Sequence, residues 1–188
     1  MQNKFVIPGD FIGTSEEFIA GSGTYEEKGS IFAAITGNVK INPREREVIV
    51  SPRTNVPPIP KVGDVVVGRI VDLKNSVALV EIARIKGRED REIVNTDEGA
   101  IHISNVKSSY VNELGREFAV HDIVKAKVID TRTMRLSTAD KQLGVVKALC
   151  TRCRSPLKRK ENSSTLICTK CERVENRKIS EDYGLGII

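Results

Sequence analysis

Four cysteines near the end of the chain are its only cysteines, and they form two Cys-x-x-Cys pairs. The pairs are Cys150 with Cys153 and Cys168 with Cys171, separated by fourteen residues. A two-residue gap lets both sulfurs of a pair reach one metal ion from a tight turn, and two such turns complete the tetrahedron that zinc prefers. The spacing therefore predicts a zinc ribbon that holds one structural Zn²⁺ through these four thiolates.

Other uses of paired cysteines fit this sequence less well. A redox-active pair is expected beside a βαβ pattern, and the sequence shows none. Disulfides suit a secreted chain, but no leader-like basic and apolar run opens this sequence. Four thiolates also leave zinc without an open position for water, so the predicted site should fold a small domain rather than support catalysis.

The composition favours a cytoplasmic protein. A hydrophobic content of 39% is enough for packed cores in 188 residues. The longest apolar runs, such as 65–67, are far too short to cross a membrane. We therefore expect reduced cysteines and no membrane partner.

Positive charge is concentrated in the C-terminal part of the chain. The formal net charge is +5, and residues 142–188 hold ten basic and five acidic residues, which accounts for the whole excess. Such a basic surface attracts phosphates, although it could also be solvated charge that offsets the thiolates. The basic residues nearest the cysteines are Arg152, Arg154, Lys158, Arg159, Lys160 and Lys170.

Proline and glycine divide the chain into four segments. Residues 57–60 contain three prolines and predict a short, stiff linker. Residues 1–56 alternate short β-branched runs with turn residues, which indicates an N-terminal β domain. Residues 61–141 predict a second β domain, and residues 142–188 the zinc ribbon. The predicted fold class is mainly β, in three small domains.

Five strands are expected in residues 61–141, with a connector between the third and the fourth. This order is typical of a five-stranded OB barrel. A mixed-charge stretch at 86–92 is expected to form a solvated loop. The expected strands are 65–71, 77–82, 99–104, 121–129 and 133–137.

Several runs carry a family resemblance. Four of them resemble the S-one type of RNA-binding OB domain: 63–68, 99–104, 122–129 and 135–137. Combined with the N-terminal runs 6–10 and 21–26 and the C-terminal ribbon, the order of parts is similar to the Csl-four type of RNA-binding cap subunit of the archaeal exosome. The resemblance covers nearly the whole chain.

The resemblance implies a function without catalysis. Such a cap subunit helps recruit RNA and funnel it into a hexameric phosphorolytic ring for 3′–5′ degradation or tailing. Three cap copies per ring are implied, with the N-terminal domain docking on the ring subunits through candidates Pro8, Gly9 and Tyr25. The ribbon end is an implied contact for the archaeal primase-like exosome protein.

Single-stranded RNA binding by an OB face needs stacking platforms and a cationic track. The family usually carries aromatics on the second strand, where this chain has Val77, Ala78 and Leu79. We therefore expect weak binding by the isolated chain, with a Kd of roughly 10⁻⁴–10⁻⁶ M. The candidate RNA-binding residues are His102, Tyr110, Lys125, Lys127, Arg69 and Arg135.

Three of the expectations for side chains follow from local pattern. Lys125 and Lys127 alternate with apolar residues, so both are expected to face solvent on the outside of the fourth strand. Phe118 is expected in the barrel core, because large aromatics in a small barrel are usually buried. Arg154 and Glu172 follow the cysteine turns at positions where a positive φ is expected.

Two other functions compete with that of an RNA-binding cap subunit. A nuclease is not expected, because there are only two histidines and no Walker loop, nucleophile elbow or HExxH motif. The remaining alternative is a factor that uses an OB barrel and a zinc ribbon on the ribosome or RNA polymerase.

Overall fold

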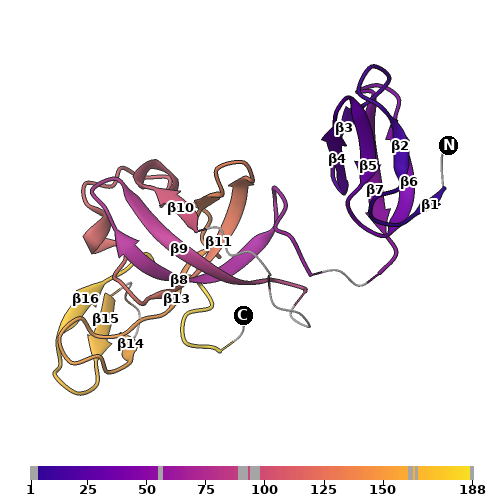
Figure 1. Ribbon diagram of the computed structural model, residues 1–188. Helices are drawn as coiled ribbons and strands as arrows, with labels where there is room; N and C mark the ends of the chain where they lie inside the picture. Colours follow the sequence, from indigo (N-terminus) through magenta and orange to yellow (C-terminus); the bar gives the residue numbers. More distant parts are fainter. Residues whose placement is uncertain are drawn as a thin grey trace. The chain divides into compact units, whose positions relative to one another are not determined.

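The computed structural model describes residues 4–54, 57–88, 93, 98–160, 163 and 165–186, and they form two compact units, Met1–Val56 and Pro57–Ile188. Within those ranges the secondary structure is β-strand with two 3₁₀ turns and no α-helix (Figure 1). No helix in the described ranges is long and apolar enough to cross a membrane. The proline-rich segment 57–60 begins the second unit.

The N-terminal unit packs two small antiparallel-rich sheets around its own core. One sheet has the order β1-β6-β7-β3 and the other β2-β5-β4. Alternating burial along β6 and β7 turns Val39, Val48 and Val50 inward, against Ile31 and Val6. The strands are β1 (Phe5–Val6), β2 (Phe11–Thr14), β3 (Ile19–Ala20), β4 (Thr24–Glu27), β5 (Ser30–Ala33), β6 (Gly37–Asn42) and β7 (Glu47–Pro52).

The second unit contains a closed five-stranded barrel of OB type. Strands pair in the order β12-β10-β9-β8-β11, and β11 also pairs with β12, which closes the sheet. The strands are β8 (Val65–Leu73), β9 (Val77–Ile85), β10 (Gly99–His102), β11 (Ile123–Asp130) and β12 (Arg135–Ser137). The mainly β class and the five-stranded OB barrel expected from the sequence are confirmed.

The connector between β10 and β11 holds both 3₁₀ turns, η1 (Ile103–Asn105) and η2 (Leu114–Arg116). The third strand ends at His102, two residues earlier than expected, because its Nδ1 accepts the Ser104 N–H and caps η1. Phe118, at the end of the connector, is fully buried in the barrel core as expected. Residues 89–92, within the expected mixed-charge loop, lie outside the described ranges.

The ribbon is continuous with the barrel. Strand β13 (Gly144–Lys147) pairs with the first residues of β11, on the edge that β12 uses further along. A three-stranded sheet then follows, formed by β14 (Leu157–Arg159), β15 (Thr165–Cys168) and β16 (Val174–Asn176). One hydrophobic cluster includes Phe118 of the barrel together with Leu157, Leu166 and Tyr183 of the C-terminal part. The Tyr183 hydroxyl donates to the carbonyl oxygen of Leu157 at 2.8 Å.

Candidate metal centre and nucleic-acid surfaces

The four cysteines lie together, with all four Sγ atoms within 4.8 Å of one another. The Sγ–Sγ distances are 3.6 Å from Cys150 to Cys171, 3.3 Å from Cys153 to Cys168 and 3.6 Å from Cys153 to Cys171. A tetrahedral zinc ion with Zn–S bonds of about 2.3 Å requires sulfurs about 3.8 Å apart. The donor set and its dimensions therefore fit one tetrahedral metal ion.

Two similar backbone turns present the sulfurs. The Arg154 N–H donates to the Cys150 carbonyl at 2.9 Å, and the Glu172 N–H donates to the Cys168 carbonyl at 3.1 Å. Both donors have a positive φ, 59° at Arg154 and 56° at Glu172, which confirms the backbone expectation. The strain of a left-handed non-glycine residue is tolerated where surrounding structure determines the turn.

The pKa values of two cysteines in the cluster are shifted in opposite directions. Hydrogen bonds from the Ser155 hydroxyl and backbone lower the pKa of Cys153 to about 6. At Cys171 the Arg173 backbone hydrogen bond opposes the shift, but burial and the neighbouring thiols raise the pKa to about 12. Four thiolates cannot accumulate so close together without a cation, and a divalent metal supplies that charge.

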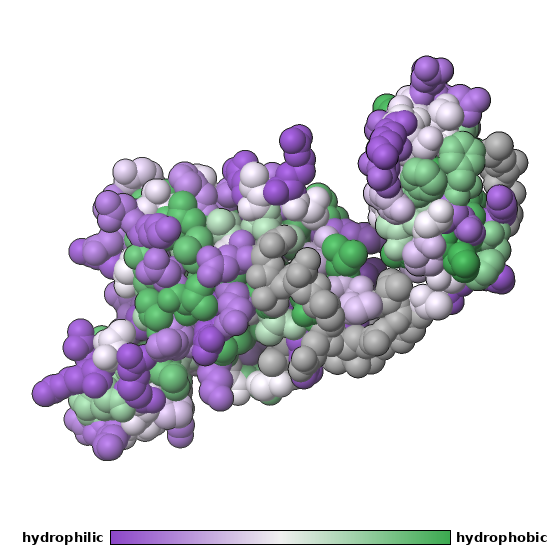
Figure 2. Space-filling view, viewed as in Figure 1, coloured by the Kyte–Doolittle hydropathy of each residue, from purple (hydrophilic) through white to green (hydrophobic). Residues whose placement is uncertain are grey.

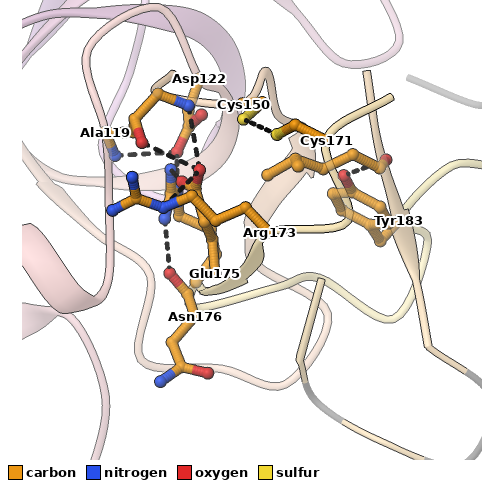
Figure 3. A network of polar contacts seen from close by, with 11 residues as sticks. Ala119, Asp122, Cys150, Cys171, Arg173, Glu175, Asn176 and Tyr183 are labelled. Carbon is orange, nitrogen blue, oxygen red and sulfur yellow. Dashed lines mark hydrogen bonds and ion pairs between the residues drawn. The ribbon is translucent and has the colours of Figure 1, made fainter. Parts of the chain in front are cut away.

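A buried chain of ion pairs connects the first cysteine turn with the barrel (Figure 3). Arg177 Nε lies 2.7 Å from Asp122 Oδ2, and its Nη2 lies 2.7 Å from Glu175 Oε2. Glu175 Oε1 accepts from the backbone and hydroxyl of Thr151, at 3.0 and 2.9 Å, between the first two cysteines. The side chains of Arg177 and Asp122 are only 3% and 1% exposed.

Burial governs the proton affinities of the two carboxyl groups in this chain. Burial raises the pKa of Asp122, outweighing the lowering effect of the Arg177 charge. Burial also opposes ionisation of Glu175, but hydrogen bonds from Thr151 and Arg177 outweigh it and lower the pKa of that carboxyl. The sequence suggests only a turn role for Asp122. The turn is present, since Ala119 N–H donates to Oδ2 at 2.8 Å, but the ion pair to a residue 55 positions away has no local signal.

The expectation that Lys125 faces solvent is wrong. Its side chain is 4% exposed and its Nζ is paired with Asp182 Oδ2. Alternation along β11 is as expected, with Lys125 and Lys127 pointing outward, but the segment around Asp182 covers the outer face at Lys125. Only Lys127 remains exposed. The lysine pattern on one strand cannot show which distant segment covers it.

Three of the remaining RNA candidates, His102, Arg135 and Lys127, lie on neighbouring strands of one barrel face. The strand registers place Leu79, Ala100 and Arg135 side by side across β9, β10 and β12. His102 lies opposite Val77 and is exposed, with its Nδ1 2.8 Å from Ser104 Oγ. We call this surface, with Lys127 on β11, the β9–β10–β12 face. Figure 2 shows hydrophobic side chains exposed on the barrel unit among hydrophilic ones.

Tyr110 and Arg69 lie outside that strand register. Tyr110 is 89% exposed in the connector between β10 and β11. Arg69, on the outside of β8, pairs with Glu81 of β9 at 2.7 Å. It is in register with Ile123 of β11 and so lies on a different part of the barrel wall.

The three docking candidates lie at the surface of the N-terminal unit. Pro8 and Gly9 form an exposed turn, where Gly9 has φ +90° and its N–H donates to the Ala33 carbonyl at 2.9 Å. Tyr25 is exposed and stacks on Phe32 with ring centroids 5.6 Å apart. Phe11 makes a T-shaped contact with Phe32, with ring centroids 6.0 Å apart. Strands β2, β5 and β4 therefore share an aromatic stripe that the sequence pattern does not reveal.

An OB barrel continuous with a four-cysteine ribbon, together with a separate β unit, defines a class of modular β proteins with a cysteine cluster that fits a metal ion. Residues 5–42 match the family described as the N-terminal region of the exosome complex exonuclease RRP4. Residues 59–121 match the family of exosome component EXOSC1/CSL4.

Relatives that match most of this chain give the more specific assignment. The chain is 45% identical over 185 residues to the exosome complex component Csl4 of Archaeoglobus fulgidus, covering 97% of this chain and 98% of the relative. It is 29% identical to human CSL4 over 77% of each chain. It is 30% identical to the exosome component Rrp4 of Methanobrevibacter smithii, over 69% of this chain and 39% of the relative. The chain belongs to the Csl4 family of exosome components.

Proposed function

We propose that this protein is a non-catalytic, RNA-binding cap subunit of the exosome, which helps deliver RNA to a phosphorolytic ring for 3′–5′ degradation or tailing. The observation that carries the proposal is the 45% identity to an exosome Csl4 component over nearly the full length of both chains. The comparisons favour this role over a factor acting on the ribosome or RNA polymerase.

The RNA-binding part of the proposal rests on the barrel. On the β9–β10–β12 face, His102 supplies an imidazole ring, and Arg135 and Lys127 supply two cations. Tyr110 is an exposed aromatic in the connector between β10 and β11. Aromatic side chains bind single-stranded bases by stacking, and cations bind phosphates. Lys125 has no part in this surface, because it is buried against Asp182. With so few stacking platforms, the isolated chain should bind RNA weakly, with a Kd of roughly 10⁻⁴–10⁻⁶ M.

The metal centre is assigned a structural role with zinc as its ion. All four ligands would be thiolates, which leaves no position for a reacting water. Cys150 and Cys168 are buried and belong to the hydrophobic cluster shared with the barrel. The ion would thus hold the ribbon in its folded form and stabilise its attachment to the barrel.

Docking on the ring is assigned to the N-terminal domain, residues 1–56. Phe11, Phe32 and Tyr25 form the aromatic stripe, which is a suitable anchor for a protein surface because aromatic residues dominate interface energetics. The Pro8–Gly9 turn is a further candidate contact. Three copies per ring, a ribbon contact with the archaeal primase-like exosome protein, and a cytoplasmic location complete the proposed assembly.

The test is a pull-down from the protein's own cell extract with a tagged full-length chain and with a chain lacking residues 1–56. The described N-terminal unit has a hydrophobic core of its own, so its removal should leave the second unit folded. Ring subunits recovered only with the full-length chain would support the proposal. Recovery of ribosomal or polymerase subunits in place of ring subunits would overturn it.

A matched pair of variants separates docking from folding. Tyr25→Ala should greatly reduce ring recovery if the aromatic stripe is the anchor. Tyr110→Ala removes an exposed aromatic side chain from the second unit and should leave ring recovery unchanged. If both variants recovered ring subunits equally well, Tyr25 would not be part of the docking surface.

A further inference from the structure

A groove of about 1000 Å³ lies between the barrel and the ribbon. One side is the outer surface of β8 and β9, and the other is β14 with the chain segment 182–186. We call this the barrel–ribbon groove. It lies on a different part of the barrel from the β9–β10–β12 face and contains one of the predicted RNA candidates, Arg69.

Strand register arranges the barrel side of the groove. Lys147 of β13, Ile123 of β11 and Arg69 of β8 are cross-strand neighbours. In the next row Lys125 lies beside Val67, which lies beside Arg84 of β9. Along these two rows cationic and aliphatic outward side chains therefore alternate as far as β8 and β9, where Arg69 faces Glu81, and the floor between the cations is apolar.

The groove is strongly cationic. Five basic side chains line it: Arg69, Arg84 and Lys147 from the barrel sheet, and Lys158 and Arg159 from the ribbon. The lining carboxylate, Asp182, is already paired with Lys125. Arg69 is paired with Glu81, and Arg159 Nε donates to the Ser163 carbonyl at 3.0 Å. Within the described ranges no carboxylate is paired with Arg84, Lys147 or Lys158.

We propose that the barrel–ribbon groove binds single-stranded RNA through its phosphates. This inference rests on the proposed RNA-binding function and gives that function a second surface. A concave site lined by one sign of charge focuses the field and concentrates the opposite ion. The phosphodiester backbone carries one negative charge per nucleotide, which matches cations that project from several elements into one channel.

Strand β9 makes the two RNA surfaces continuous. Its outward residues run from Val77 and Leu79, on the β9–β10–β12 face, past Glu81, whose carboxylate is paired with Arg69, to Ala83 and the neighbouring Arg84 in the groove. A strand of RNA that leaves one face along β9 therefore enters the other. The ribbon contributes Lys158 and Arg159 to this path, which assigns a role to two of the six basic residues near the cysteines.

The experiment compares three full-length, metal-loaded variants by fluorescence anisotropy with a labelled single-stranded oligouridylate at several salt concentrations. The groove variant carries Arg84→Gln, Lys147→Gln and Lys158→Gln, all at exposed positions. The control variant carries Lys28→Gln, Lys40→Gln and Arg44→Gln, which remove the same charge from exposed positions of the N-terminal unit. The third variant carries His102→Ala, Lys127→Gln and Arg135→Gln on the β9–β10–β12 face.

The groove variant should bind about tenfold more weakly than the control at roughly 0.1 M salt, and its log–log salt slope should fall by about 2, because three phosphate contacts are lost. Unchanged thermal midpoints would show that all variants are folded. If the groove variant binds like the control while the face variant is weakened, the groove proposal is overturned and the proposed function stands. If the parent chain binds no oligouridylate at all, both are overturned.

An acidic peptide is the competing occupant. A labelled oligoglutamate of the same length, titrated under the same conditions, distinguishes it from RNA. Tighter binding of the peptide than of the RNA, lost in the groove variant while RNA binding is kept, would identify a protein-docking groove and overturn the proposal. Weaker peptide binding supports it.

Discussion

The N-terminal unit and the ribbon are built in opposite ways. The N-terminal unit contains two sheets and a hydrophobic cluster of its own, which includes Val6, Ile31 and Val48. The ribbon contributes Leu157 and Leu166 to the cluster of the barrel, adds β13 to the barrel sheet and joins it through buried ion pairs. A small module can therefore be stabilised either by closing its own core or by extending that of a neighbour.

The difference has a thermodynamic consequence. A sheet of three short strands buries too little apolar surface to be stable alone, so we expect the ribbon to depend on a bound metal ion and on the barrel. The ribbon and barrel should then unfold together, whereas the N-terminal unit should unfold separately.

The largest effect is expected from removal of the metal. Structural zinc supplies about 10 kcal/mol or more of folding free energy in small domains. In calorimetry, a strong chelator should lower the transition of the Pro57–Ile188 unit and leave the transition of the N-terminal unit in place. An equal downward shift of both transitions would contradict the separation.

Loss of the central arginine should be next in size. Arg177→Met leaves Asp122 and Glu175 buried without their partner, and breaking a buried pair in this way costs about 3–5 kcal/mol. Denaturant unfolding should show this loss only in the transition of the second unit. Arg173→Met is the control, because Arg173 is half-exposed and 3.8 Å from Glu175, and it should cost less than about 1 kcal/mol.

A cavity in each core tests the comparison directly. Ile31→Ala truncates a fully buried side chain of the N-terminal unit and should destabilise that unit by about 2–5 kcal/mol. Leu166→Ala is its counterpart in the ribbon and should lower the shared barrel–ribbon transition by a similar amount. Calorimetry of the two variants should move different transitions. A ribbon that melts without the barrel would show that their common cluster does not couple them.

The smallest effect concerns the C-terminal segment and depends on pH. The hydrogen bond and charge of Lys125 lower the pKa of Asp182 in the folded chain, so this carboxylate stabilises the fold above its ordinary pKa of 3.8 and loses that contribution as pH falls through its folded pKa. Asp182→Asn should lower the Tm at neutral pH, and the gap to the parent chain should narrow toward pH 3. A gap that does not narrow would show that the pair contributes no ionic stabilisation.

Local pattern was sufficient for much of this molecule. The barrel strands follow from β-branched runs between turn residues, and the cysteine cluster follows from doubled spacing that only a common ligand site explains. Arg154 and Glu172 could also be predicted, because the turn that presents two sulfurs fixes the backbone of the next residue. These features depend on residues close together in the sequence.

The features that were missed depend on distant residues. Asp122 pairs with Arg177 and Lys125 with Asp182, across separations of 55 and 57 residues. Each looks like an ordinary turn or surface residue within its own segment. The individual strands β2, β3 and β4 have no strong local signal either, because strands of two to four residues are defined mainly by the partners with which they pair.

The pairing of β13 with β11 affects how this protein can be divided. A barrel that ends at residue 141 would lose β13 and leave the backbone of 123–125 as an open edge, since β12 covers only the later part of β11. It would also expose Lys125 without Asp182. Open strand edges pair with other chains and promote aggregation. A fusion protein that carries this barrel should therefore also include β13, the cysteine turns and the C-terminal segment.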